Sequence, residues 1–417
     1  MFRLKYYATM FAVIIGLLTT FWQVELSAQA ESAAVASQIS PASSLMVPMG
    51  ENDLNPFVLP LGGLFGAQKT IGGLAFLAPA APVTYTVNVT TDTGAGSGTT
   101  GDLRYAITQV NAGSGGDTIN ITATGTITLG SALPTITKAV TINGPGADLL
   151  TISGNHIVGV LKIGIVGGLQ ACISVSISDL TIANGLSDFG GGIEHRGCVG
   201  DVLTLKRLAF SANKAFGAGG GLYAAVDTVI ENCTFSINSG GSSTTAAING
   251  GGAIFSAVGS LKITNSTFSA NRADRDAGPS SGGAINAFSS SDLTIINSTF
   301  TGNLACSFTA GGIFANNVQS MTLRNTIVAG NCGFDFPDVA FFGRGTASIS
   351  NSLFGSPVTG VTNGVNGNII TAAALLGPLG DYGGPTQTFP LLPGSPARFG
   401  VNDLPLSHHN RALDRLR

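Results

Sequence analysis

The feature that most constrains the fold is a short phrase, Phe-x-x-Asn, that recurs in the second half of the chain. Its four full copies are Phe210–Asn213, Phe235–Asn238, Phe268–Asn271 and Phe300–Asn303. Weaker copies end at Asn184 and Asn331, and the six asparagines recur at intervals of 25 to 33 residues. A period of this length is typical of solenoids, propellers and arrays, in which each unit stacks on its neighbours.

Between the copies lies a glycine pair followed by an apolar residue. The pairs are Gly191-Gly192, Gly220-Gly221, Gly251-Gly252, Gly282-Gly283 and Gly311-Gly312. Short β-branched runs such as Leu261–Thr264 and Leu293–Ile296 predict strands, and no segment of the repeat has a sustained helical period. The sequence therefore predicts an all-β, single-stranded, right-handed parallel β-helix with one repeat per coil and coils about 4.8 Å apart.

A second asparagine series supports stacked coils. These asparagines lie three residues before the phenylalanine, or its equivalent, of each copy: Asn232, Asn265, Asn297, Asn325 and Asn351. We expect the amides of such a series to hydrogen-bond along the stack, the phenylalanines to form an internal column, and the glycines to occupy tight corners. The alternative is a disordered Gly/Ser/Asn segment. The regular apolar positions and the positive mean hydropathy of +0.37 favour the solenoid.

This combination of Phe-x-x-Asn with Gly-Gly-Ala-Ile resembles the repeat of polymorphic outer membrane proteins. The resemblance covers about 175 residues. It implies membership of the pectate-lyase-like group of right-handed β-helices, bacterial proteins that are commonly secreted or held at the cell surface.

The chain is poor in charge. Its 417 residues carry a net charge of −3, and only 10% are charged, against about a quarter in a typical protein. Its 59 glycines are about twice the usual share. Such a surface offers little electrostatic attraction for nucleic acid. We expect one elongated, monomeric domain without a nucleic-acid partner.

Residues 1–30 read as a secretory signal peptide. Arg3 and Lys5 give a basic start, Ala8–Trp22 is an apolar run, and Ala28–Ala30 has the small-x-small form of a cleavage site. The apolar run is short for a membrane span, so we expect none in the mature chain. An uncleaved anchor is the alternative. Export predicts a secreted, cell-surface or outer-membrane location.

Three further segments follow the signal peptide. Residues 31–82 read as a linker of low regularity, residues 83–370 as the parallel β-helix, and residues 371–417 as a C-terminal wrap. Asp102 is placed to cap a short helix. The apolar face of that helix is formed by Leu103, Ala106, Ile107 and Val110. We expect this helix to cap one end of the solenoid and prevent edge-to-edge growth.

Both ends of the solenoid resemble parts of secreted bacterial β-helix proteins. Gly101–Arg104 resembles their Cys-Ser-Leu-Arg-Glu-Ala-type cap, although Gly101-Asp102 replaces Cys-Ser and Tyr105 replaces Glu. Residues 375–397 resemble the C-terminal choice-of-anchor module, of the Q-like kind. We expect this proline-stiffened segment to cover the other end.

Five cysteines leave the disulfide pattern open. Cys172 and Cys198 are 26 residues apart, as are Cys306 and Cys332, which is roughly one coil. Equivalent positions on adjacent coils are within disulfide range. Cys233 would then be unpaired. The alternative is that all five are small buried side chains.

The chain has few residues with catalytic potential. Glu194-His195-Arg196 is the densest polar triplet, and later repeats supply no partners at the equivalent positions. It reads as a solvated corner more readily than as a catalytic site. Asp274-Arg275-Asp276 reads as a charged loop tip that could bind calcium or a glycan. We assign no catalytic, cofactor-binding or metal residue.

The sequence favours an exported, non-enzymatic scaffold that acts in adhesion or contact with a polysaccharide or cell-surface glycan. The alternative is a polysaccharide lyase or glycoside hydrolase of the pectate-lyase-like group. Hydrolysis requires paired carboxylates and a lyase requires a calcium cluster with a base. The chain has only 22 acidic residues and no adjacent aspartate pair, which disfavours both activities.

Overall fold

The computed structural model describes the strand backbones at residues 65–71 and 74–79, and residues 81–166, 169–241, 250–274, 281–288, 292–305 and 309–398. The chain divides into two compact units, Met1–Pro60 and Leu61–Arg417, and every described residue belongs to the second. The predicted signal peptide, residues 1–30, lies outside the described residues.

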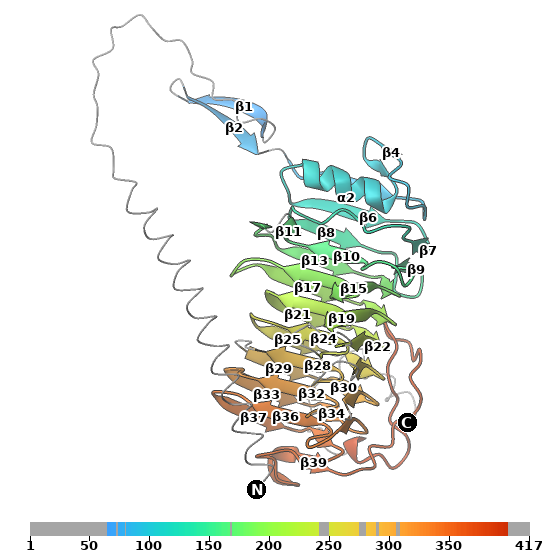
Figure 1. The fold of residues 1–417 in the computed structure, drawn as a ribbon, viewed down its shortest axis with the longest axis vertical. Coiled ribbons are helices and arrows are strands. Elements are labelled where there is room, and N and C mark those ends of the chain that lie inside the picture. Colours follow the sequence, from blue (N-terminus) through green and yellow to red (C-terminus); the bar gives the residue numbers. More distant parts are fainter. Residues whose placement is uncertain are drawn as a thin grey trace, which may run out of the picture. The chain divides into compact units, whose positions relative to one another are not determined.

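Four sheets, almost entirely parallel, form the body of the second unit, and successive coils add strands to them (Figure 1). The 12-stranded sheet contains, in spatial order, β37 (Thr346–Ser350), β33 (Ser320–Arg324), β29 (Asp292–Ile296), β25 (Leu261–Thr264), β21 (Asp227–Glu231), β17 (Val202–Lys206), β13 (Val175–Ser178), β8 (Val140–Asn143), β6 (Asp117–Ile121), β3 (Thr84–Val87), β5 (Thr100–Gly101) and β4 (Gly96–Ser97). The 10-stranded sheet contains β39 (Ile369–Ile370), β38 (Leu353–Phe354), β34 (Ile327–Val328), β30 (Thr299–Thr301), β26 (Thr267–Ser269), β22 (Thr234–Ser236), β18 (Ala209–Ser211), β14 (Thr181–Ala183), β9 (Leu150–Ser153) and β7 (Gly125–Thr128).

Two smaller sheets complete each coil. The seven-stranded sheet contains β10 (Leu161–Ile163), β16 (Ile193–Arg196), β20 (Leu222–Ala225), β24 (Ile254–Ser256), β28 (Ile285–Phe288), β32 (Ile313–Asn316) and β36 (Val339–Phe342). The six-stranded sheet contains β15 (Leu186–Phe189), β19 (Lys214–Ala218), β23 (Ser239–Gly240), β27 (Arg272–Ala273), β31 (Leu304–Ala305) and β35 (Cys332–Gly333). The predicted all-β parallel solenoid is confirmed, and its handedness stays a prediction.

The phenylalanines of the repeat form the predicted internal column. Strand register pairs Phe210, Phe235, Phe268 and Phe300 in turn, each one coil from the next. Successive ring centroids lie 4.3, 4.9 and 4.4 Å apart, with interplanar angles of 2 to 3°. All four rings are fully buried. Burial of each side chain contributes roughly 1.5–3 kcal/mol, which is why the phrase repeats once per coil.

The asparagines of the same phrase form a buried ladder, which we call the inner ladder. It consists of Asn213, Asn238, Asn271, Asn303 and Asn331. Each of the first four side-chain amides donates to the Oδ1 of the next asparagine at 2.8–2.9 Å, and all five donate to a backbone carbonyl of the preceding coil at 2.9–3.0 Å. Each Oδ1 also accepts a backbone N–H from the preceding coil. The amides are therefore satisfied although they are buried.

The inclusion of Asn184 in this series is wrong. Strand pairing aligns Ile182 with Phe210, so Gly185, and not Asn184, occupies the position equivalent to Asn213. The backbone N–H of Gly185 donates to Asn213 Oδ1 at 2.9 Å and begins the ladder there. At its other end the Asn331 amide donates to Asp338 Oδ1 at 3.0 Å. Burial raises the pKa of Asp338.

The second asparagine series occupies the same corner of five consecutive coils, and we call it the corner series. Its five members, predicted above, have φ between +48° and +55°. Among residues with a side chain, asparagine tolerates this left-handed conformation best. The Asn325 amide donates to Asn297 Oδ1 at 3.1 Å, and the Asn297 amide donates to Asn265 Oδ1 at 3.2 Å. Strand register aligns Asn232 with Asn265, so the predicted stacking is confirmed.

Glycines shape another corner, as predicted. Gly251 has a φ of +62°. A Cβ on the next residue, Gly252, would lie 2.2 Å from the carbonyl oxygen of Gly283 on the following coil. The first glycine therefore supplies a left-handed turn, and the second allows adjacent coils to approach.

The predicted helix is present as α2 (Leu103–Ala112), and the side chain of Asp102 accepts from the Tyr105 N–H at 2.8 Å. Asp102 also accepts from three successive backbone N–H groups, 93–95, at 2.7–3.1 Å. These bonds lower its pKa although burial opposes the shift. The helix face predicted to be apolar is buried in the same core as the first coils. Its role in preventing edge-to-edge growth stays a prediction.

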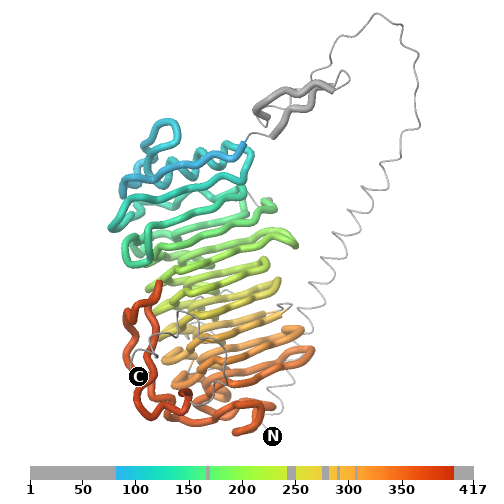
Figure 2. Tube along the Cα trace, turned by 180° about the vertical axis from the view of Figure 1, so that it is seen from behind, coloured from blue at the N-terminus to red at the C-terminus, as the bar shows by residue number. Residues whose placement is uncertain are grey.

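Only part of the C-terminal segment lies near the end of the solenoid that it was expected to cover, where Leu376 and Ala397 pack with Leu353 of β38. Residues 376–391 fold into an irregular antiparallel loop that runs back along the side of the coils (Figure 2). Thr386 Oγ1 donates to the Asn232 carbonyl at 3.1 Å, and the hydroxyls of Thr388 and Thr267 lie 3.2 Å apart. Short 3₁₀ helices, η1 (Val365–Gly367) and η2 (Pro396–Arg398), flank this loop. Hydroxyl contacts therefore hold the C-terminal segment against the side of the coils. The spacing of residues in the sequence could not predict this position.

The range 31–82, predicted to be a linker, contains an antiparallel pair, β1 (Phe65–Ile71) and β2 (Leu74–Pro79). A second pair, β11 (Ile165–Val166) and β12 (Leu169–Gln170), lies within the coils.

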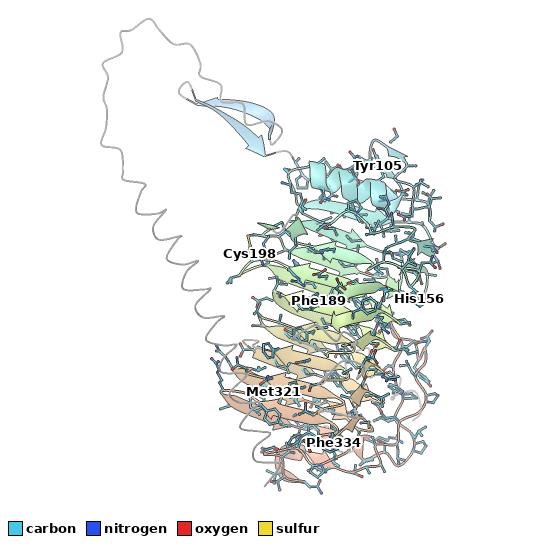
Figure 3. The ribbon with its side chains drawn as sticks, in the orientation of Figure 1. Tyr105, His156, Phe189, Cys198, Met321 and Phe334 are labelled. Carbon is cyan, nitrogen blue, oxygen red and sulfur yellow. A yellow bond between two sulfur atoms is a disulfide. The ribbon has the colours of Figure 1, made fainter. Side chains whose placement is uncertain are left out.

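One of the predicted disulfides is present. Cys172 and Cys198 are bonded, with their Cα atoms 4.9 Å apart (Cys198 is labelled in Figure 3). Cys332 is also disulfide-bonded, and its predicted partner, Cys306, lies outside the described residues. Cys233 is free and fully buried, as the leftover cysteine was expected to be. Burial raises the pKa of its thiol to about 12.

Candidate functional site

The triplet Glu194-His195-Arg196 is not a solvated corner. It lies within β16, where alternate side chains point to opposite faces of the sheet. Glu194 and Arg196 face outward, whereas His195 is fully buried in the interior. The glutamate and histidine therefore cannot act together on one substrate.

The outward pair forms a small ionic cluster with aromatic contacts. The Glu194 carboxylate forms ion pairs with Arg196, whose Nε lies 2.7 Å away, and with Lys162, whose Nζ lies 3.4 Å away. The Arg196 guanidinium lies 4.8 Å from the ring centroids of both Phe189 and Tyr223 (Phe189 is labelled in Figure 3). Two cations flank the carboxylate, with no second carboxylate, so this cluster lacks the pair that a glycosidase needs. Cation–π contacts cover the rings that a sugar would otherwise stack on.

His195 is an unusual interior residue. Neither ring nitrogen makes a well-formed hydrogen bond, and burial lowers the pKa of its imidazole to about 4 against a smaller opposing contribution from the Ile173 backbone. The charge of Asp201 opposes this shift in part. A Cβ on Gly197 would lie 2.5 Å from Asp201 Oδ2 and 3.2 Å from His195 Nε2, so the glycine leaves room for both groups. The histidine is enclosed and is not placed to meet a ligand.

The charged loop at Asp274 is only partly described, because Arg275 and Asp276 lie outside the described residues. Asp274 is buried and pairs with Arg272 Nε at 2.7 Å. Its other carboxylate oxygen accepts from the hydroxyl of Ser239. Within the described ranges, no group of three or more His, Cys, Asp or Glu side chains could hold a metal ion. Asp274 thus has two protein partners, and binding of calcium or a glycan by this loop stays a prediction.

The most regular polar surface lies on the outward face of the 12-stranded sheet. Strand register brings four half-buried hydroxyl side chains into one row on the consecutive strands β6, β8, β13 and β17, and we call this row the hydroxyl face: Thr118, Thr141, Ser176 and Thr204. Adjacent strands lie about 4.8 Å apart, so the hydroxyls recur at that spacing. The row is interrupted at Val229 and Lys262 and resumes at Thr294.

A second polar row runs beside the hydroxyl face. Asn143 Nδ2 donates to Asn120 Oδ1 at 3.0 Å, and Ser178 Oγ donates to Asn143 Oδ1 at 3.2 Å. The next coils continue the row with Lys206 and Glu231, whose charged groups are 3.0 Å apart. These contacts orient the side chains beside the hydroxyl face. The hydroxyl face is neutral on all four strands, whereas the second row is neutral on β6, β8 and β13 and charged at Lys206 of β17.

Sequence reasoning missed the hydroxyl face although a signal for it exists. Most of its members occupy the centre of an apolar-Thr/Ser-apolar triplet, as in Val140-Thr141-Ile142, Val175-Ser176-Ile177 and Leu203-Thr204-Leu205. The apolar neighbours point into the core, so the central hydroxyl must point outward. Only the strand register shows that these triplets align.

Comparison with known proteins adds no function. No protein-family model matches this chain, and no curated protein matches it. The class defined by the fold is therefore a parallel β-solenoid repeat protein. In the part of the chain that the structure describes, no helix has the length and apolar character needed to cross a membrane.

Proposed function

We propose that this protein is an exported, non-enzymatic β-solenoid scaffold whose hydroxyl face contacts a neutral polysaccharide at or outside the cell surface. The observation that carries the proposal is the row of Thr118, Thr141, Ser176 and Thr204 on four consecutive strands. Each hydroxyl can donate and accept hydrogen bonds, as can the hydroxyls of a sugar.

The chemistry of this face favours a neutral ligand. The row of hydroxyls carries no charge, and the cation that borders it on β17, Lys206, is paired with Glu231, so little positive charge is left to select a uronate or a phosphate. A flat array of weak contacts suits an extended polymer, because several modest interactions along one chain combine into useful avidity.

Two features support export. The basic start, apolar run and small-x-small site within residues 1–30 have the form of a signal peptide. The Cys172–Cys198 disulfide is of a kind that persists in oxidising compartments. Immunoblotting of medium, envelope and cytosol from the producing cell tests this part of the proposal, and a purely cytosolic protein contradicts it.

Binding is tested by co-sedimentation of the full chain with cellulose, chitin and insoluble α-glucan, and with pectate as the charged comparison. We expect retention on at least one neutral polymer. The double variant Thr141→Lys/Thr204→Lys places charge and bulk on the hydroxyl face, and we expect it to weaken that retention at least about tenfold. The matched control is Ser211→Lys, an equally half-buried hydroxyl position on the 10-stranded sheet. Equal losses in the double variant and the control would refute the assignment of the face.

The absence of catalysis is tested separately. Incubation with the same polymers, with and without calcium, should release no reducing ends and no unsaturated uronate. Turnover that Glu194→Gln abolishes would establish the lyase or hydrolase alternative instead.

A further inference from the structure

The two ends of the 12-stranded sheet differ in how their edges are protected. At the N-terminal end, β5 pairs with β3 and folds back antiparallel onto β4. At the C-terminal end the sheet stops at β37 (Thr346–Ser350), which pairs with β33 alone. The loop of the C-terminal segment does not pair with this edge and contacts the corner residue Asn232 and Thr267 of the 10-stranded sheet.

Hydrogen bonds show which backbone groups of β37 face the open edge. The Asn325 N–H donates to the Ser350 carbonyl, so that carbonyl points toward β33. Backbone groups of successive residues in a strand point to alternate sides, so those of Ala347 and Ile349 point away from β33. Consistent with this, the Ile349 carbonyl accepts from the side-chain amide of Asn368 at 3.0 Å. The N–H and C=O of Ala347 and the N–H of Ile349 remain at the edge, with no partner among the described residues.

A pocket of about 780 Å³ borders this edge. One wall is formed by residues 346–351, and the other is formed by Thr359, Gly360, Thr362 and residues 365–368. The lining contains hydroxyl, amide and backbone groups together with Ala347, Ile349 and Val365, and no charged side chain. The recess therefore suits an uncharged ligand that lies along β37.

The sequence of β37 lacks the usual protection of an edge strand. Exposed edges are commonly blunted by lysine, proline or a bulge. The five residues Thr-Ala-Ser-Ile-Ser contain neither lysine nor proline, and they pair with β33 without a register shift. Asn368 occupies the Ile349 carbonyl, and the Asn366 carbonyl accepts from the N–H of Asn351 just beyond β37, so the groups left over are those at Ala347 and the N–H of Ile349. Such a strand is a template for a further strand.

We propose that the β37 edge binds an extended, uncharged segment of a partner polypeptide, which adds one strand to the 12-stranded sheet. The free groups recur every second residue, about 6.6 Å apart, which is the repeat of an extended peptide backbone. A polysaccharide has no matching alternation of donors and acceptors. The uncharged lining selects a segment of about five residues without charged side chains, and small polar residues fit against the hydroxyls of Ser348 and Thr362. This site is separate from the hydroxyl face and does not depend on the function proposed for it.

The test uses the full chain and a fluorescein-labelled peptide, Gly-Thr-Ala-Ser-Ile-Ser-Asn-Ser, which copies β37 and its flanks. We expect saturable binding by fluorescence anisotropy and slowed hydrogen exchange at the amides of Ala347 and Ile349. Ala347→Pro removes one edge N–H without removing a bond to β33, so it should weaken binding at least about tenfold with an unchanged melting temperature. The matched control, Ala347→Ser, keeps the N–H and should bind as the parent does.

Four results overturn the proposal. The first is the absence of peptide binding, and the second is equal binding by Ala347→Pro and its parent. The third is protection of the two amides by a neutral polysaccharide but not by the peptide. The fourth is a concentration-dependent dimer, seen by analytical ultracentrifugation, that Ala347→Pro abolishes, because a second copy of the chain would then be the occupant.

Discussion

The inner ladder and the corner series are both columns of asparagines with one member per coil, yet they hold the solenoid in different ways. The inner asparagines are buried, and their amides bond to both neighbouring coils. The corner asparagines are partly exposed, have positive φ, and in the stretch from Asn265 to Asn325 share two side-chain bonds. The inner column is required for stability because the backbone groups that it bonds are buried, where no water can replace the asparagine side chains. The corner column is favoured because asparagine suits the turn.

The largest effect should come from breaking the inner ladder. Asn271→Leu removes the acceptor of the Asn238 N–H and amide and the donor to the Phe235 carbonyl. Each buried group left without a partner costs about 1–3 kcal/mol, so the free energy of unfolding should fall by about 4 kcal/mol. Urea denaturation followed by circular dichroism measures the loss. The corner variant Asn265→Leu serves as the control, and an equal loss there would contradict the distinction between the columns.

His195 is also a buried polar side chain, but it lacks the hydrogen bonds that satisfy the asparagines of the inner ladder. His195 has a pKa of about 4 in the folded state, against about 6.5 when unfolded. Between these values the unfolded chain binds more protons, so stability is complete above about pH 6.5 and is lost as the pH falls toward 4. The loss attributable to this histidine should reach about 3 kcal/mol.

Denaturation series at pH 4.5 and pH 7 test this effect. His195→Leu should show a smaller difference between the two pH values than the parent. His156→Asn, a change at an exposed histidine, should leave the difference unchanged. An unchanged pH dependence in His195→Leu would contradict the role of the buried imidazole.

The sequence predicted the features that repeat, because stacking forces equivalent residues into one column. The phenylalanine column, the corner asparagines and the Cys172–Cys198 bond all follow from spacing near one coil. It failed where a single copy departs from the pattern. In the weak copy the asparagine, Asn184, lies one residue before the ladder position, which Gly185 takes.

Three other features required coordinates. Alternate side chains of a strand point to opposite faces, and this places His195 inside. The triplet alone does not show that it lies in a strand. The C-terminal segment reaches coils more than 100 residues earlier in the chain, at Asn232 and Thr267, through contacts that no local pattern encodes. The hydroxyl face needed the register of several strands. Periodicity therefore predicts the column, whereas the orientation of single side chains and the course of the ends depend on long-range contacts.

A moderate effect is expected at the corner. Asn297→Ala keeps the left-handed backbone but loses asparagine's tolerance of it, which costs roughly 1–2 kcal/mol, together with the two bonds to Asn265 and Asn325. Asn297→Gly removes the backbone strain and loses only the side-chain bonds, so it should be less destabilising than alanine. Thermal denaturation of both variants distinguishes the contributions. An alanine variant as stable as the glycine variant would show that φ is not what selects asparagine.

The smallest effect concerns the first coils, where a charged pair replaces the corner asparagines. Asp179 and Arg207 occupy the same corner with φ of +62° and +52°, and they form a two-pronged ion pair at 2.5 and 2.6 Å. A partly exposed pair of this kind contributes about 1 kcal/mol or less and is screened by salt. The double variant Asp179→Asn/Arg207→Asn continues the corner series with neutral amides. Its stability at low salt should lie within about 1 kcal/mol of the parent, because the preference of asparagine for the turn offsets the lost ion pair. Denaturation at 20 mM and 1 M NaCl measures how stability depends on salt, and the double variant should show a smaller dependence than the parent. An unchanged dependence would mean that this ion pair contributes nothing to stability at the corner.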